Sequence, residues 1–319
     1  MPPRHPPGAD SGPDIAIART LDLVAVLIRA GLPSRRAWSL VAARDPSLLA
    51  VEHACRDGVP VGAALRSVAT SGVDPRAADA WRQVGVAWAV ADRIGAPAAA
   101  TLGAVATALR QSADGHRAVA VALAGPTTSG RIVLALPLVG VLFGLLWGDQ
   151  AMRFLLATPV GWACLLGAGM LVALARAWTS ALVRRATPVA GIPGMFLEIW
   201  AVALSGGASR GTAAAVVADE LGQEDRAIPI DLRAPEEERH AVQEVLALAD
   251  AAGVPAVELL RARADDVRRD TAAARLVAAE RLGARLVLPL GLCVLPAFVL
   301  VGVVPVIAGI LSSTVAGLR

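Results

Sequence analysis

Apolar residues recur at helical spacing along most of this chain, and glycine and proline mark where helices end and begin. Leu21, Val24 and Leu27 lie three residues apart, as on one face of a helix. Gly31 stands where the left-handed residue after a helix belongs, and Pro33 opens the next helix. The same punctuation predicts four further helices, from Pro46 to near Gly58, from Pro60 to near Ser71, from Pro75 to near Gly95 and from Pro97 to near Ala124. We therefore expect six helices here, three of them short, and no strand.

The helical pattern occurs twice. Residues 21–42 align without a gap with residues 197–218 at an offset of 176. The identical pairs are Leu21/Leu197, Ala25/Ala201, Val26/Val202, Gly31/Gly207, Ala37/Ala213, Val41/Val217 and Ala42/Ala218. A second matching stretch follows each copy, at 91–110 and 249–268. A duplicated helical unit predicts two related helical bundles.

The second copy is shorter than the first. Gly31 and Gly95 are 64 positions apart, whereas Gly207 and Gly253 are 46 apart. The difference corresponds to one or two short helices. The rest of the second copy is predicted to contain a polar loop at 222–234, a helix that starts with three glutamates at Pro235–Glu238, and a last helix that starts at Pro255.

Three long segments carry no charged residue, namely 132–148, 155–175 and 286–311. A helix crosses the apolar core of a bilayer with about 20 residues, so the last two are long enough and the first is at the short end. The linker 149–154 is too short for a domain, so the first two segments are expected to form a hairpin. Kinks are expected in the third at Pro289, Pro296 and Pro305.

Arginines gather at particular ends of these segments and thereby predict an orientation. The positive-inside rule places 1–131 and 176–285 in the cytoplasm and leaves the C-terminus outside. The predicted fold class is an all-α membrane protein. We expect a disordered leader (1–14), a first helical domain (15–130), a transmembrane hairpin (131–183), a second and shorter helical domain (184–284), a third transmembrane helix (285–312) and an external tail (313–319).

Composition excludes several kinds of chemistry. All 30 basic residues are arginine, so the chain has neither a P-loop lysine nor a lysine that could form a Schiff base. The net charge is only +3, tyrosine is absent and only four phenylalanines occur, which argues against nucleic-acid binding. Cys55, Cys164 and Cys293 lie far apart and are interpreted as small buried apolar residues rather than as a zinc or redox site.

The sequence predicts no catalytic, cofactor-binding or metal-binding residue. His53 and Cys55 are two positions apart on a predicted helix, so their side chains do not face each other. Glu236–Glu238 diverge around a helix start and are interpreted as solvated rather than as a metal site. Arg261 and Asp265, together with Arg269, are spaced four apart and are interpreted as a solvated helix face.

Taken in order, these features resemble the type II secretion system F-domain family, the inner-membrane platform proteins of type II secretion, type IV pilus and Tad pilus machines. The resemblance extends over residues 15–312. It is carried by the helix openings (Leu23–Gly31 and Ile199–Gly207) and by the turns (Gly95–Pro97 and Gly253–Pro255). It is also carried by the Leu-Pro strings (Leu136–Pro137 and Leu288–Pro289) and by the entry to the second apolar segment (154–162).

The resemblance implies a non-enzymatic protein of the cell membrane, with two cytoplasmic six-helix bundles and three spans. It implies binding of a hexameric assembly ATPase in the cytoplasm and of pilin or pseudopilin subunits in the membrane, and self-association or pairing with a paralogous platform protein. This chain departs from the family in its shortened second bundle. Tad-type platforms often divide the two copies between two polypeptides, whereas this chain carries both. Arg35 and Arg36 are interpreted as solvated surface, with contact to the ATPase as the alternative.

Two other classes of function stay open. A small transporter or channel subunit would need polar or charged residues in its spans, and the three apolar segments contain no Asp, Glu, Arg or His. A membrane-anchored enzyme would need convergent titratable groups within residues 1–130.

Overall fold

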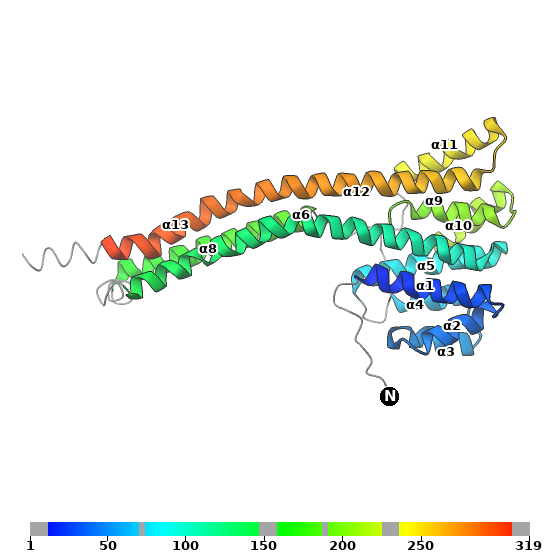
Figure 1. Ribbon diagram of the computed structural model, residues 1–319, viewed down its shortest axis with the longest axis horizontal. Coiled ribbons are helices and arrows are strands. Elements are labelled where there is room, and N and C mark those ends of the chain that lie inside the picture. The colour runs from blue at the N-terminus through cyan, green and yellow to red at the C-terminus, as the bar shows by residue number, and fades with distance from the viewer. Residues whose placement is uncertain (1–11, 70–73, 147–157, 187–190, 225–235, 308–319) are drawn as a thin grey trace, which may run out of the picture. The chain divides into compact units, whose positions relative to one another are not determined.

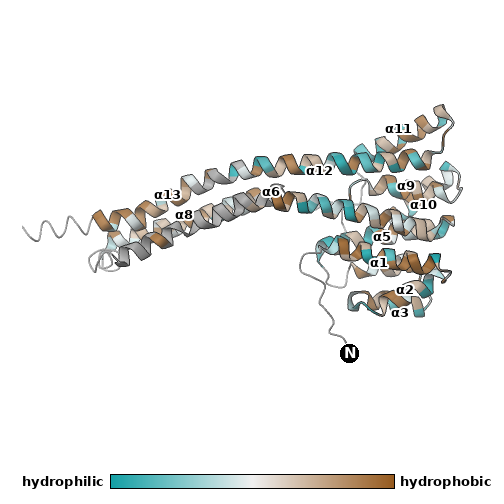
Figure 2. Ribbon diagram, viewed as in Figure 1, coloured by the Kyte–Doolittle hydropathy of each residue, from teal (hydrophilic) through white to brown (hydrophobic). Residues whose placement is uncertain are grey.

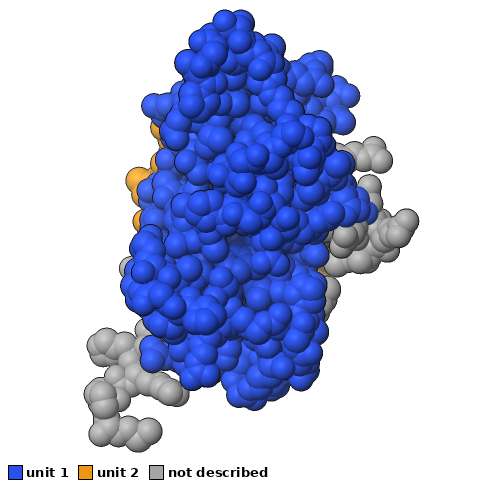
Figure 3. All heavy atoms as spheres, turned by 90° about the vertical axis from the view of Figure 1, so that its right-hand side faces the viewer, with its two compact units in different colours: residues 1–116, 189–273 blue, residues 117–188, 274–319 orange. Residues whose placement is uncertain are grey.

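The computed structural model describes residues 12–69, 74–146, 158–186, 191–224 and 236–307, and within them every regular element is a helix (Figure 1). These residues confirm the all-α fold class. The chain divides into two compact units, which Figure 3 colours separately. Unit 1 comprises residues 1–116 and 189–273, and unit 2 comprises residues 117–188 and 274–319.

The first copy of the duplication, repeat 1, forms the expected six helices. They are α1 (Pro13–Arg29), α2 (Ser34–Ala42), α3 (Leu49–Arg56), α4 (Val61–Val68), α5 (Pro75–Ile94) and α6 (Ala98–Leu146). The third helix begins later than predicted, because Pro46–Leu48 forms a separate 3₁₀ turn, η1. The Asp45 carboxylate accepts a hydrogen bond from the Ser47 N–H at 2.9 Å and fixes this turn.

The predicted glycine helix ends are confirmed, with positive φ at Gly31, Gly58, Gly95, Gly207 and Gly253. At the end of α1, the Leu32 N–H donates to the Leu27 carbonyl at 3.1 Å and the Gly31 N–H donates to the Ile28 carbonyl at 2.9 Å. This is the Schellman arrangement, which satisfies carbonyls that the helix leaves unpaired.

The second copy, repeat 2, contains α9 (Met195–Ser205), α10 (Arg210–Glu224), α11 (Glu236–Ala252) and the first part of α12 (Ala256–Pro289). They correspond in order to α1, α2, α5 and α6. Among the residues described in repeat 2, none forms a counterpart of α3 or α4. Most of the predicted loop 222–234 lies outside the described residues.

The two repeats share one hydrophobic core within unit 1. α5 packs against α1 and α4 of its own repeat and also against α9 and α10 of repeat 2. The Trp38 and Trp88 rings meet edge to face in repeat 1, with centroids 5.7 Å apart. The same core cluster continues into repeat 2 through Val202 and Val217. The predicted bundles therefore pack together, and their limits at 15–130 and 184–284 stay a prediction.

The prediction that the sixth helix ends near Ala124 is wrong, because α6 continues without a break to Leu146. Gly125 and Pro126 are the breaker signals that the prediction followed. A proline removes one backbone donor and can bend a helix, but the hydrogen bonds on either side of it can persist. Residues 132–146 are thus the end of α6, and 147–148 lie outside the described residues.

One helix in the described part of the chain is long and apolar enough to cross a membrane. It is the Pro159–Leu182 portion of α8 (Pro159–Ala186). The segment Gly291–Ile307 forms a shorter apolar helix, and Figure 2 shows its hydrophobic colouring around α13 (Leu295–Phe298). The predicted second span began at 155, but 155–157 lie outside the described residues. The three-span arrangement stays a prediction.

Within unit 2, α8 packs against the C-terminal apolar segment through small side chains. Cys164, Ala168 and Ala175 are buried on one face of α8. Small residues allow two helices to approach closely in apolar surroundings.

Two π-helical segments, η2 (Leu290–Val294) and η3 (Val299–Val303), flank α13. Each lies just before a proline, Pro296 or Pro305. The wider π turn relieves the clash between a proline ring and the carbonyl four residues earlier. The predicted disturbance of helical geometry therefore takes the form of π turns at these two prolines, whereas Pro289 ends α12 as an ordinary α-helix.

Candidate functional site

A carboxylate in the first turn of an apolar helix is the centre of the most buried charge cluster in the described residues. α9 has the sequence MFLEIWAVALS, in which Glu198 is the sole charged residue. Its side chain is 3% exposed. A carboxylate this deeply buried must be paired to stay ionised.

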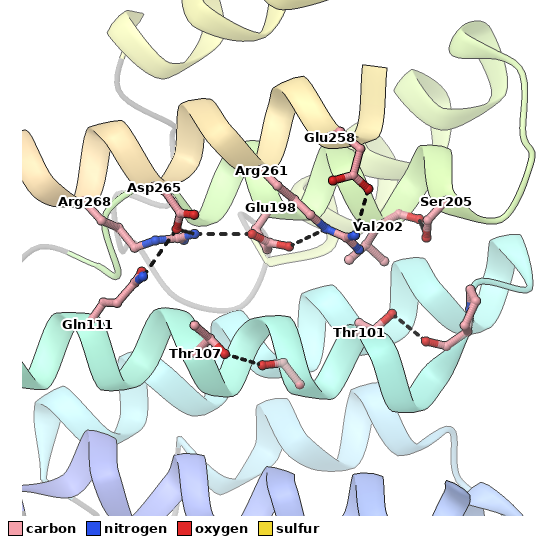
Figure 4. A network of polar contacts seen from close by, with 12 residues as sticks. Thr101, Thr107, Gln111, Glu198, Val202, Ser205, Glu258, Arg261, Asp265 and Arg268 are labelled. Atoms are coloured by element: carbon pink, nitrogen blue, oxygen red, sulfur yellow. Dashed lines mark hydrogen bonds and ion pairs between the residues drawn. The ribbon is translucent and has the colours of Figure 1, made fainter. Parts of the chain in front are cut away.

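Two arginines of α12 supply that pairing, as Figure 4 shows. Arg268 Nη2 lies 3.4 Å from Glu198 Oε2, and Arg261 Nε lies 3.5 Å from Glu198 Oε1. The arginines are seven residues apart, so they lie on one face of α12. The Arg268 side chain is 6% exposed, and Arg261 is partly buried. The prediction of a solvated face fits Asp265 and Arg269, which are 45% and 74% exposed, and is wrong for Arg261, which α9 partly covers.

Asp265 extends the cluster to α6. Its Oδ1 atom accepts hydrogen bonds from Arg268 Nη2 at 2.9 Å and from Gln111 Nε2 of α6 at 3.4 Å. A Cβ atom added to Gly115 of α6 would lie 3.5 Å from the Ala272 Cβ atom of α12, so the two helices approach closely here. The cluster thus connects α6, α9 and α12 near the point where α6 and α12 leave unit 1.

The same ion pair occurs at the equivalent positions of repeat 1. Asp22 corresponds to Glu198 at the offset of 176, and Arg110 corresponds to Arg268 at the end of the second matching stretch. Arg110 Nη2 pairs with Asp22 Oδ2. Their side chains are 42% and 41% exposed, in contrast to the buried pair of repeat 2. In each repeat, then, an arginine of the last helix pairs with an acid of the first.

Glu238 of α11 contacts the N-terminal end of α9, one turn before Glu198. Its Oε1 atom accepts a hydrogen bond from the N–H of Gly194, the N-cap residue of α9, at 3.0 Å. Burial raises the pKa of Glu238, while hydrogen bonds from the Gly194 and Phe196 N–H groups and the charge of Arg268 oppose that rise. The helix N-terminus favours a negative charge at this position. The prediction of a solvated start at Glu236–Glu238 holds for the exposed Glu236 and Glu237 and is wrong for Glu238.

A second polar cluster joins the two repeats. Glu220 of α10 is buried and accepts hydrogen bonds from Arg66 of α4 and from Arg93 of α5, both at 3.0 Å. Arg93 also pairs with Asp219. On the opposite side of the joint, the Gln83 Oε1 atom of α5 accepts from the Ile192 N–H at 3.2 Å. Buried groups paired in this way fix the position of repeat 2 on repeat 1.

The other residues considered from the sequence have structural roles. Cys55 is buried, and desolvation raises the pKa of its thiol, with a smaller opposing effect of Arg35. A raised pKa disfavours the nucleophilic thiolate. Arg35 donates to the carbonyls of Cys55 at 3.2 Å and Val59 at 3.3 Å, where α3 ends. The raised pKa of the Cys55 thiol and the contacts of Arg35 do not support a pair in which Cys55 is the nucleophile and His53 the base.

The charged cluster around Glu198 holds α12 against α9. It contains carboxylates, guanidinium groups and amides, and no group of metal-binding residues occurs among the described side chains. Displacing α12 along α9 would separate buried opposite charges, which is strongly unfavourable in a low-dielectric interior. One signal in the sequence could have located it: a lone acid in an apolar helix, with an acid at the equivalent position of the other repeat.

Neither family models, nor curated proteins, nor solved structures match this chain.

Proposed function

We propose that this chain is a membrane platform protein of a pilus-assembly or type II-like secretion machine. In this proposal, the helical unit 1 lies in the cytoplasm and binds a hexameric assembly ATPase, and the apolar segments of unit 2 contact pilin or pseudopilin subunits in the cell membrane. The platform hydrolyses no nucleotide itself and passes the motion of the ATPase to the membrane.

One observation carries the proposal: both long helices run from the duplicated unit directly into the apolar unit. α6 extends over Ala98–Leu146, and α12 continues from Ala256 through the π turns to the end of the described chain. A continuous helix transmits displacement along its axis, whereas a flexible linker would absorb it. The ion pairs of Glu198 join α12 to α9, and the hydrogen bond between Gln111 and Asp265 joins α6 to α12, so a displaced bundle would carry both helices with it.

The surface of α8 supports the membrane part of the proposal. Large apolar side chains recur every fourth residue on its exposed face: Trp162, Leu166, Met170, Leu174 and Trp178. An apolar stripe of this length suits contact with lipid, with tryptophans near the two interfaces. Together with the arginines that flank the apolar segments, it favours three spans with the N-terminus in the cytoplasm and the C-terminus outside.

Topology mapping tests the arrangement in the membrane. Reporter fusions after residues 120, 190 and 319 are expected to report cytoplasm, cytoplasm and exterior. Fusions that place residues 120 and 190 on opposite sides of the membrane would contradict the platform proposal.

The partner is tested by co-purification. The full chain, extracted in mild detergent, is expected to retain the assembly ATPase of the same genome and to release an unrelated hexameric ATPase under the same conditions. Deletion of the gene is expected to abolish filament assembly or secretion, and the wild-type gene to restore it. Normal filaments in the deletion strain, with no ATPase retained, would overturn the proposal.

A further inference from the structure

Three apolar positions are exposed in repeat 1 but buried in repeat 2. Val26 of α1 is 50% exposed, whereas its counterpart Val202 of α9 is fully buried. The complete set of such pairs is Leu23/Ile199, Val26/Val202 and Leu40/Val216. We call Leu23, Val26 and Leu40 the α1–α2 face. Equivalent residues with opposite burial show that something covers this face in repeat 2 and leaves it open in repeat 1.

The cover in repeat 2 is α5 of repeat 1. α5 packs directly on α9 and α10. The approach is close at its C-terminal end, because a Cβ atom added to Gly206 would lie 2.9 Å from the Ile94 carbonyl oxygen and 3.2 Å from the Ala96 nitrogen. Gln83, Val90 and Ile94 follow one face of α5, and the first and last of these contact repeat 2.

The helix equivalent to α5 in repeat 2 is α11. Its positions near the C-terminal end are exposed, whereas Ala241, the counterpart of Gln83, is buried. Val90 aligns with Leu248 just before the second matching stretch, and Ala96 aligns with Val254 within it. Val90 is fully buried, whereas Leu248 is 56% exposed, and Val254 is also exposed. We call Leu248 and Val254 the α11 face. Figure 1 shows α11 at one end of the stack of helices in unit 1, and α2 and α3 at the other.

We propose that a second copy of this chain continues the packing of the repeats, with the α1–α2 face of one copy on the α11 face of the next. The contact between repeats within the chain is heterologous, since α5 of one repeat meets the first two helices of the other. A heterologous contact between two units leaves one surface of each kind unused unless the units close into a ring. The two unused surfaces here are the α1–α2 face and the α11 face.

Two exposed residues next to these faces, Arg44 and Glu244, carry opposite charges. Glu220, which meets arginines within the chain, has Arg44 as its counterpart in repeat 1, and Arg44 is exposed. Glu244 is exposed on α11. No described residue of repeat 2 provides a counterpart of α4, so the contact between copies has less area than the contact within the chain. This inference rests on the packing of the repeats and does not depend on the proposed platform function.

Cross-linking between two differently marked chains tests the proposal. Cys55, Cys164 and Cys293 are replaced by alanine, and Val26→Cys and Leu248→Cys are introduced into separate full-length chains. Mixed in mild detergent and treated with a short bis-maleimide, the two chains are expected to cross-link to each other and neither to itself. Cross-links of Val26→Cys chains with one another, or no cross-link in the mixture, would overturn the head-to-tail contact.

A second experiment tests the same contact by placing a charge on the α1–α2 face. Leu40→Asp on the Val26→Cys chain is expected to lower the mixed cross-link yield about tenfold, since burying an unpaired carboxylate is unfavourable. Val59→Asp is the matched control, because Val59 is exposed in the turn before α4 and belongs to neither face. Equal yields from the two variants would also overturn the proposal. Neither assay requires an ATPase or a filament, so their failure is distinguishable from failure of the platform function.

Discussion

Repeat 1 and repeat 2 place the same ion pair in different surroundings. Asp22–Arg110 lies at the surface of unit 1, whereas Glu198–Arg268 lies in its interior. The difference arises because α9 is packed on one side by α5 and α10 and on another by α11, while α1 has α2 and α5 and keeps an open face. Aligned residues with equivalent partners are therefore expected to contribute differently to stability, according to what covers them.

The largest expected effect comes from removing the arginine of each pair. Arg268→Leu leaves the buried Glu198 carboxylate poorly compensated and is expected to lower the free energy of unfolding by about 3–5 kcal/mol. Arg110→Leu removes an exposed pair and is expected to change it by less than about 1 kcal/mol. Denaturant unfolding of both full-length variants in detergent measures the difference.

The double variant Glu198→Leu/Arg268→Leu separates charge burial from packing. Replacing both partners with apolar side chains is expected to recover most of the lost stability. If Arg110→Leu and Arg268→Leu destabilise the chain equally, burial is not what distinguishes the two pairs.

A second expected effect follows from helix α4, for which repeat 2 shows no counterpart in its described part. A Cβ atom at Gly85 of α5 would lie 2.7 Å from Arg66 Cγ and 2.9 Å from the Gly62 carbonyl oxygen of α4. Gly85→Val is therefore expected to destabilise the fold by about 2–3 kcal/mol through overpacking. The equivalent residue of α11 is the exposed Gln243, and Gln243→Val is expected to cost about 0.5 kcal/mol. Thermal unfolding of the two variants compares them, and equal losses would contradict the close packing of α4 on α5.

The repeats are expected to respond alike at their shared turns. Gly95 and Gly253 have φ values of 75° and 66°, in the left-handed region that side chains with a Cβ disfavour. Gly95→Ala and Gly253→Ala are each expected to lower the free energy of unfolding by about 1 kcal/mol. A loss at one turn only, measured by differential scanning calorimetry, would show that the two turns are not equivalent.

The smallest expected effect is a pH dependence confined to repeat 2. Because burial raises the pKa of Glu238, the folded state binds its proton more tightly than the unfolded state. This contribution to stability is complete below the unfolded pKa and is lost as the pH rises through the folded pKa. Wild type is therefore expected to lose stability relative to Glu238→Gln as the pH rises above the ordinary pKa of glutamate, as measured by unfolding at a series of pH values. A constant difference between the two chains would contradict the assigned burial of this carboxylate.

Helix ends were predictable from the sequence because they depend on neighbouring residues. Gly31 and Gly95 adopt the left-handed conformation that their position predicts, whichever helices lie nearby. The pairing of Glu198 with Arg268 depends on residues 70 positions apart, and its burial depends on the helices that cover α9. Local patterns also failed at Pro126, since a proline marks a possible helix end and α6 continues past it. The lone acid of α9 indicated a site, but the depth of its burial could not be inferred.

The π turns give the C-terminal apolar segment an unusual periodicity. Cys293, Ala297, Val301 and Pro305 are all buried, at intervals of four residues. On a regular α-helix, each such interval advances about 40° beyond a full turn, so a four-residue pattern would soon leave the contact face. An extra residue in each π turn cancels this drift. The buried positions that meet α8 can therefore stay on one side of the helix along this segment.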